Sequence, residues 1–163
     1  MSPDEYLDAA AGRLRVDGAD VSTLQMRGLT ALVGYRSDFR WRWMATRLNL
    51  FTVLINVPSV TASELELFAN EALDYAVSQK GKFRGLQGGV AAIPVLIGSR
   101  VDPDAATFAS TRLIRRFSAF AWPAAVDLSS QRSYHHQGRV AMGGVYASWM
   151  RQQTAVALPP LIG

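Results

Sequence analysis

The stretch Gly81–Val101, GKFRGLQGGVAAIPVLIGSRV, decides the fold expected for this chain. Its second half, Val90–Ile97, is a nearly uninterrupted apolar run with the length and composition of a strand covered on both faces. A cationic, glycine-rich turn precedes this run, and a second turn follows it. The sequence therefore predicts a central strand at Val90–Ile97, with the rest of the chain covering that strand or leading into it.

The composition is that of one globular domain. Of the 163 residues, 49% are hydrophobic and 18% are charged, which is enough apolar material for a core. We expect one compact domain over residues 1–163, with residues 158–163 as a tail. No apolar segment has the roughly 18 residues of a membrane helix, and the acidic start SPDEY does not resemble a signal peptide. Without cysteine, the chain lacks disulfides and thiolate sites, which favours a cytoplasmic protein that does not bind membranes.

Periodicity, caps and turn residues predict the remaining elements. A capping box at Ser2 and Glu5 begins the first helix, and a second box at Thr61 and Glu64 begins the longest one. Ala19–Arg27 is ambiguous, and Arg36–Asp38 is expected to be a turn. In chain order, we expect a helix over 3–15, strands at Leu29–Tyr35, 39–43 and Leu48–Val57, a helix over 62–79, the strand Val90–Ile97, a helix from Pro103 that includes Leu113 and Ile114, strands at 119–128 and Arg132–Gln137, and a helix over 145–156.

This order, α-β-β-β-α-β-α-β-β-α, predicts an α+β or mixed α/β fold with a single mixed sheet and three or four packed helices. Leu48–Val57 and Val90–Ile97 would be neighbouring parallel strands joined by the 62–79 helix. In the segment 39–43, strict alternation places Phe39, Trp41 and Trp43 on a core face and the intervening arginines on a solvent face.

The turn before the central strand is the candidate anion site. Glycine turns can leave N–H groups free for an anion, and neighbouring cations add to the attraction. The turn matches neither the phosphate loop nor the dinucleotide fingerprint, and it precedes a strand instead of a helix. The alternative is a helix end followed by an ordinary loop, in which the cations complement the helix dipole. The candidate residues are Lys80, Lys82, Arg84, Gly85, Gln87 and Gly88.

Other chemistry has little support in the sequence. His135 and His136 are adjacent, so on a strand they would point to opposite faces and would be poorly placed to hold one metal ion. No G-x-S-x-G elbow presents a serine nucleophile. We therefore predict no catalytic residues, no metal and no cofactor, which favours a protein that is not an enzyme.

The order of elements over residues 3–97 resembles that of restriction-endonuclease-like nucleases. Such nucleases hold a divalent cation with an acid on one strand and an Asp/Glu-x-Lys motif on the next. Leu48–Val57 contains neither an acid nor a lysine, and Asp38 has no partner at the required spacing. The resemblance implies at most a nuclease-like domain without its catalytic residues.

Charge is distributed unevenly along the chain. Residues 1–74 carry a net charge of −3 and residues 75–163 a net charge of +7, so the second half suits an anionic ligand, nucleic acid or simply a solvated basic surface. Our first hypothesis is a non-catalytic binding or interaction domain that self-associates as a homodimer. The alternatives are a small enzyme or binder of a phosphorylated ligand that uses the turn 80–89, and a catalytically incomplete, nuclease-like domain that binds nucleic acid.

Overall fold

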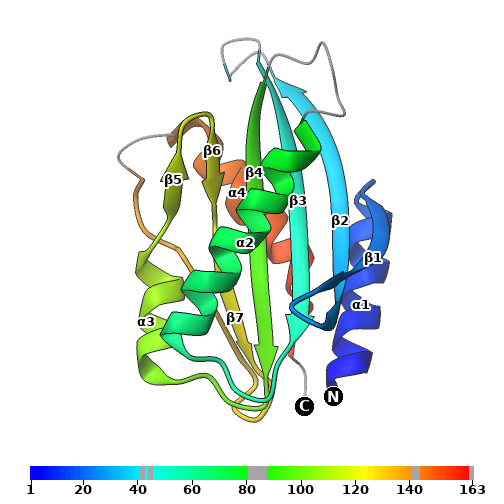
Figure 1. The fold of residues 1–163 in the computed structure, drawn as a ribbon, viewed down its shortest axis with the longest axis vertical. Helices are drawn as coiled ribbons and strands as arrows, with labels where there is room; N and C mark the ends of the chain where they lie inside the picture. Colours follow the sequence, from blue (N-terminus) through cyan, green and yellow to red (C-terminus); the bar gives the residue numbers. More distant parts are fainter. Residues whose placement is uncertain (41–42, 44–45, 81–87, 141–143, 162–163) are drawn as a thin grey trace.

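The computed structural model describes residues 1–40, 43, 46–80, 88–140 and 144–161. Within these residues, the chain forms four helices and one mixed sheet of eight strands (Figure 1), which confirms the predicted fold class. The elements are α1 (Pro3–Val16), β1 (Asp20–Met26), β2 (Leu29–Arg40), β3 (Thr46–Asn56), α2 (Ala62–Lys80), β4 (Gly88–Gly98), α3 (Pro103–Thr111), β5 (Ile114–Arg116), β6 (Ala119–Ala121), β7 (Ala124–Asp127), β8 (Arg132–His135) and α4 (Gly144–Ala157).

The strand β4 lies at the centre of the sheet, as the sequence predicts. Its neighbour β3 runs parallel to it, with Leu50 opposite Ala91 and Ile55 opposite Leu96. On the other side, β4 pairs in parallel with β6 near its start and with β7 near its end. Antiparallel strands complete both sides of the sheet: β1 and β2 beyond β3, β5 beyond β6, and β8 beyond β7. The parallel β3–α2–β4 unit is therefore confirmed.

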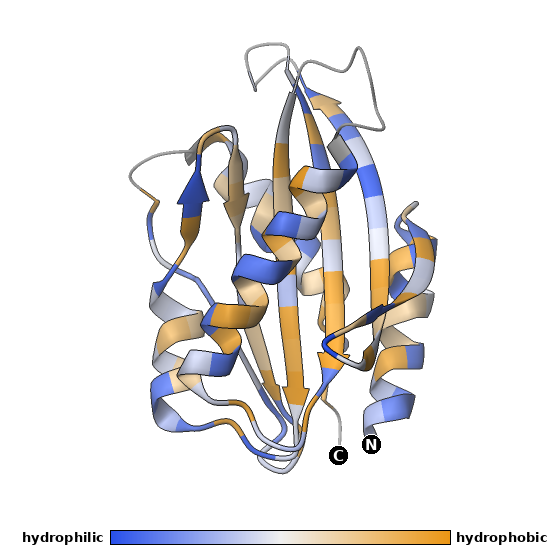
Figure 2. Ribbon diagram, in the orientation of Figure 1, coloured by the Kyte–Doolittle hydropathy of each residue, from blue (hydrophilic) through white to orange (hydrophobic). Residues whose placement is uncertain are grey.

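Two apolar cores cover the two faces of the sheet. The helices α2 and α3 pack on one face and α1 and α4 on the other (Figure 1). Side chains of β4 alternate between these cores: Ile93 and Val95 face α1 and α4, whereas Ala92 and Leu96 face α2 and α3. Apolar residues accordingly predominate along β3 and β4 (Figure 2), as expected for strands that are buried on both faces.

Both predicted capping boxes are present. The Glu5 N–H donates to Ser2 Oγ at 3.2 Å, and the Ser2 N–H donates to Glu5 Oε2 at 2.7 Å. At the start of α2, the Glu64 N–H donates to Thr61 Oγ1 at 3.2 Å, and the Thr61 N–H donates to Glu64 Oε2 at 3.4 Å. These reciprocal bonds satisfy N–H groups that a helix start leaves without partners.

The prediction of a turn at Arg36–Asp38 was wrong, because β2 continues through these residues. Arg36 lies opposite Leu50 and Asp38 opposite Leu48. The polar side chains satisfy one another along one face of the strand: Arg36 Nε donates to Asp38 Oδ2 at 2.7 Å, and Arg36 also forms an ion pair with Asp17. Cross-strand pairing therefore outweighs the turn preference of these residue types.

The alternation predicted for residues 39–43 holds only in part. The strand β2 ends at Arg40, so the two-residue period does not extend to Trp43. Trp43 is buried as predicted, but Phe39 is 44% exposed, which contradicts its assignment to the core face. Trp41 and Arg42 lie outside the described residues.

Two further segments differ from the sequence prediction. Asp20–Met26 within the ambiguous Ala19–Arg27 segment is a strand, β1, at the edge of the sheet. The third helix ends at Thr111 because Arg112 has extended backbone angles. Ile114 then belongs to β5, where it pairs with Ala121, and is not part of the third helix as predicted.

A buried carboxylate, that of Asp127, joins the loops at the end of β4 and β7. Its Oδ2 accepts from the Val101 N–H at 3.0 Å, and its Oδ1 accepts from the Ser129 hydroxyl and the Ser130 N–H, each at 2.9 Å. Burial raises the pKa of Asp127, but the hydrogen bonds from Ser130, Val101 and Ser129 lower it by more, so the net shift is downward. This acid therefore has a structural role at the end of the sheet.

Among the described helices, none is both long enough and apolar enough to cross a membrane.

Candidate ligand-binding pocket

The predicted anion turn is largely outside the described residues, so its binding role stays a prediction. Lys82, Arg84, Gly85 and Gln87 belong to the segment 81–87, which the structure does not describe. Lys80 is the last residue of α2, and Gly88 is the first residue of β4. The structure therefore tests only the local role of Gly88.

Gly88 is required by close backbone packing. A Cβ atom at this position would lie 2.1 Å from the carbonyl oxygen of Arg47, the residue opposite it in β3. We expect Gly88→Ala to lower the free energy of unfolding by about 1–3 kcal/mol, because the strands must separate to admit a methyl group. Chemical unfolding measures the change. Gly12→Ala in α1 is the control, since a Cβ there meets nothing within 4 Å. Equal stability of the two variants would contradict the close approach of β3 and β4 at Gly88.

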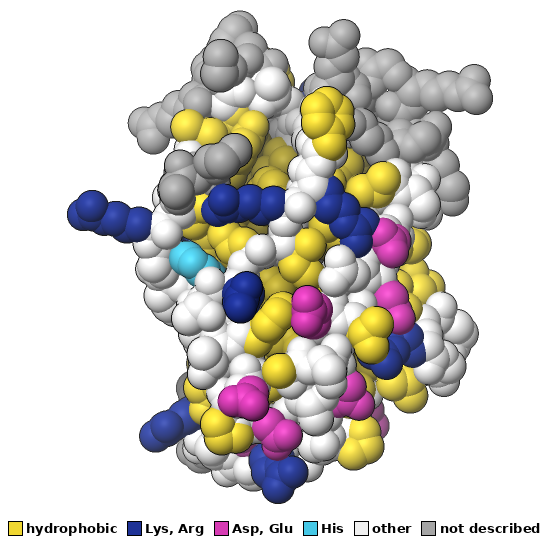
Figure 3. Space-filling model, turned by 60° about the vertical axis from the view of Figure 1, so that its left-hand side comes forward, with side chains coloured by type: hydrophobic (Ala, Val, Ile, Leu, Met, Phe, Trp, Pro, Cys, Tyr) yellow, Lys and Arg dark blue, Asp and Glu magenta, His cyan; other side chains and the backbone are white. Residues whose placement is uncertain are grey.

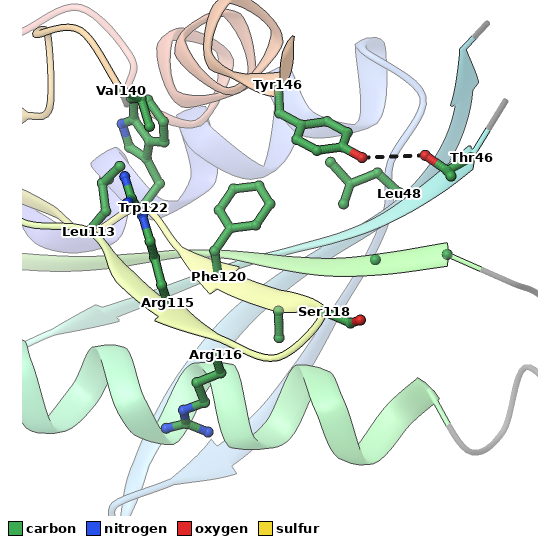
Figure 4. A pocket seen from close by; sticks show the side chains of 13 residues that line it. Thr46, Leu48, Leu113, Arg115, Arg116, Ser118, Phe120, Trp122, Val140 and Tyr146 are labelled. Atoms are coloured by element: carbon green, nitrogen blue, oxygen red, sulfur yellow. Dashed lines mark hydrogen bonds between the residues drawn. The ribbon is translucent and has the colours of Figure 1, made fainter. Parts of the chain in front are cut away.

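Beside the start of β4 lies a pocket of ≈ 560 Å³. It is bounded by β3 and β4, by the β5–β6 hairpin and by the start of α4 (Figure 4). Figure 3 shows this side of the molecule, where apolar side chains line a hollow with basic side chains and a histidine at its margin. The larger apolar and aromatic residues of the wall are Leu48, Leu113, Phe120, Trp122, Val140 and Tyr146.

In the β5–β6 hairpin, the side chains of Arg115 and Arg116 point to opposite faces of the sheet. Arg115 lies opposite Phe120 in the strand pair and Arg116 lies opposite Ala119. Neighbouring residues of a strand point to opposite faces, and Phe120 packs on the α1–α4 side of the sheet. Arg116 also borders the pocket, but its guanidinium is directed toward α2 and forms an ion pair with Asp74 (Figure 4).

Arg115 thus brings a positive charge to the pocket. Within the described part of the chain it has no ion-pair or hydrogen-bond partner. In Figure 4 its side chain extends along the wall toward Trp122.

The aromatic wall is held in place by contacts to neighbouring strands and α4. The ring centroids of Phe120 and Tyr146 are 6.0 Å apart, and those of Trp43 and Tyr146 are 5.2 Å apart. The hydroxyls of Tyr146 and Thr46 are hydrogen-bonded at 3.3 Å, and the Thr46 hydroxyl also donates to the Trp43 carbonyl oxygen at 2.6 Å. This wall is therefore formed before any ligand binds.

Trp122 contributes a buried hydrogen-bond donor to the wall. The residue is only 2% exposed, and its Nε1–H has no hydrogen-bond partner among the described residues. The His136 ring packs edge-on against the indole with a centroid distance of 5.4 Å, and the Arg151 Cζ lies 5.9 Å from the indole centroid. A buried N–H without an acceptor is costly, so this donor points to a missing polar partner.

His136, which packs against Trp122, and its chain neighbour His135 both have lowered pKa values. Burial lowers the pKa of His136 below its ordinary value, and the positive charges of Arg151 and Arg115 lower it further. Burial is also the largest cause of the lowered pKa of His135. In the described segments, no three metal-ligating side chains come together.

The sequence did not predict this pocket. Leu113 was expected in the helix that starts at Pro103, and Trp122 in the strand region 119–128. One local signal was available: the segment Phe117–Trp122 carries three aromatic residues within six positions directly after two arginines.

No protein-family model, no curated protein and no solved structure matches this chain at a significant level. The resemblance of the element order to nucleases therefore assigns no residue of this chain a role.

Proposed function

We propose that this protein is a non-catalytic binding domain whose pocket holds a small, mainly apolar molecule that carries one negatively charged group. The observation that carries this proposal is the pocket of ≈ 560 Å³, with aromatic walls and with Arg115, which has no ion-pair partner among the described residues. Its volume lies in the usual range for small-molecule sites, which are mostly apolar with a few polar groups that orient the ligand.

The polar groups of the pocket suit binding better than catalysis. Among the described residues that line it, there is no carboxylate and no histidine to act as a general base. The hydroxyl of Thr46 is occupied by the Trp43 carbonyl oxygen and by Tyr146. Of the two arginines in the lining, Arg116 is paired with Asp74 and Arg115 can pair with an anion, but neither transfers protons at neutral pH.

Binding of a neutral fluorescent probe tests the apolar part of this proposal. We expect N-phenyl-1-naphthylamine to bind with increased fluorescence, because its rings can pack against Phe120 and Tyr146. Phe120→Ala should weaken this binding by about tenfold, since an aromatic contact contributes about 0.5–1.5 kcal/mol beyond the area that it buries. A fluorescence titration measures the dissociation constant.

The matched control is Phe117→Ala, which makes the same change in the same hairpin at a residue that is 99% exposed. It should leave the dissociation constant unchanged, and a urea unfolding curve should show that both variants are folded. Equal effects of the two substitutions, or no binding to the wild type, would refute the pocket as a ligand site.

Self-association and nucleic-acid binding stay predictions. Light scattering over a wide range of protein concentration tests the first, and a strict monomer would contradict it. Titration with oligonucleotides at low and high salt tests the second, because contacts to phosphates weaken as salt rises.

A further inference from the structure

We propose that the Trp122 end of the pocket is a carboxylate subsite, in which the Arg115 guanidinium and the Trp122 indole N–H hold the anionic group of the ligand. This inference rests on the proposed function and specifies its ligand. The two groups line the same pocket and lie along the same part of its wall (Figure 4).

The indole N–H of Trp122 is a donor without a partner among the described residues. Trp122 can only donate through Nε1, the residue is 2% exposed, and no described residue accepts from this atom. The described neighbours that bracket the indole are His136 and Arg151. Neither accepts a hydrogen bond from it, so an acceptor supplied by a ligand would satisfy the N–H.

Two arginines give this end of the pocket its positive charge. Arg115 lines the pocket together with Trp122, and the Arg151 Cζ lies 5.9 Å from the indole centroid. Their charges also lower the pKa of His136, whose ring packs against the indole. In the described part of the chain, no carboxylate forms an ion pair with Arg115 or Arg151. An anion at this position would therefore meet uncompensated positive charge.

The charge of the lining distinguishes a carboxylate from a phosphate. Two of the described residues that line the pocket are cationic, and one of them, Arg116, is paired with Asp74 of α2. The other, Arg115, matches a carboxylate through two parallel N–H groups, and Trp122 adds a donor beside it. Arg151 is not part of the lining: it donates through Nη2 to the Gly138 carbonyl oxygen, and its Nε has no partner among the described residues. One uncompensated cation in the lining fits a single negative charge better than a phosphate dianion.

Competition against N-phenyl-1-naphthylamine tests the subsite with three probes that share one ring system: 1-naphthoate, its neutral isostere 1-naphthamide, and 1-naphthyl phosphate. We expect 1-naphthoate to bind the wild type about tenfold more tightly than 1-naphthamide, as a charge-assisted contact implies. Arg115→Gln should remove this preference and leave the affinity for 1-naphthamide unchanged.

The matched control is Arg116→Gln, which removes the same charge from the next residue, whose guanidinium binds Asp74. It should preserve the preference for 1-naphthoate. A second readout is the indole N–H resonance of Trp122 in a ¹H–¹⁵N spectrum, assigned by its absence in Trp122→Phe. Saturation with 1-naphthoate should shift this resonance, and 1-naphthamide should shift it less.

Three outcomes would overturn the assignment. If 1-naphthoate and 1-naphthamide bind equally well while the fluorophore still binds, the subsite and the negative charge of the proposed ligand are wrong, and the apolar part of the proposed function stands. If 1-naphthyl phosphate binds more tightly than 1-naphthoate and depends on Arg115, the carboxylate assignment is wrong. If neither the fluorophore nor 1-naphthamide binds, the pocket itself is not a ligand site, and both proposals fail.

Discussion

Leu96→Ala is expected to lower the free energy of unfolding by about 2–5 kcal/mol, the range for a buried leucine truncated in a packed core. Leu96 is fully buried at 0% exposure in β4, and it lies opposite Ile55 in β3 and Ala125 in β7. Strands flank it on both sides and α2 and α3 cover it, so the surroundings have little freedom to fill the cavity. Urea unfolding monitored by circular dichroism measures the loss.

The control for this prediction is Leu67→Ala in α2, where the leucine is 55% exposed. The same atoms are removed there without leaving a cavity, and alanine has the higher helix propensity, so stability should change by less than about 0.5 kcal/mol. A loss below about 1 kcal/mol for Leu96→Ala would mean that β4 is not the centre of a tightly packed sheet.

Asp127→Ala is expected to lower the free energy of unfolding by about 3 kcal/mol at neutral pH. The substitution removes the acceptor of three hydrogen bonds and leaves the Val101 N–H without a partner in a buried loop. Hydrogen bonds to a charged group contribute about 1.5–3 kcal/mol, and a buried donor left unsatisfied costs about 1–3 kcal/mol. Chemical unfolding of the wild type and the variant measures the difference.

The pH dependence of this difference identifies the carboxylate as its origin. The pKa of Asp127 is lower in the folded protein than in the unfolded chain, where it is about 3.9. Its charged form therefore stabilises the folded state fully above that unfolded value, and the contribution is lost as the pH falls through the lower folded pKa. The stability difference between wild type and Asp127→Ala should shrink below about pH 4; a difference that stays constant down to acidic pH would show that only side-chain packing is lost.

The sequence was sufficient for the centre of the fold because several independent signals agree there. Val90–Ile97 is apolar throughout, and the helix that precedes it has a capping box and a regular apolar stripe. The same reasoning failed where one signal acted alone. The edge strand Asp20–Met26 is mostly exposed or half-buried, so it has no strong apolar alternation, and pairing with β2 determines its structure.

The pocket could not be predicted from the sequence for a different reason. Its walls come from segments far apart in the chain, such as Thr46, Arg115 and Tyr146, and no local spacing relates them. The short strand Ile114–Arg116 determines which arginine faces the pocket. Three residues are too few to show the two-residue alternation by which a strand is predicted from sequence. Only the paired register with β6 determines which arginine faces the pocket.

Arg115 and Arg116 are adjacent, so the length of the connection before them determines which of the two charges faces the pocket. Between the end of α3 at Thr111 and the start of β5 at Ile114 lie only two residues. Because side chains alternate along a strand, a one-residue insertion or deletion that shifts β5 by one position would exchange the faces of its side chains. The guanidinium that now binds α2 would then turn to the pocket, and the pocket's own arginine would turn outward. The length of this connection and the charge of the pocket are thus constrained together, beyond the apolar contact that Leu113 of the connection itself adds to the wall.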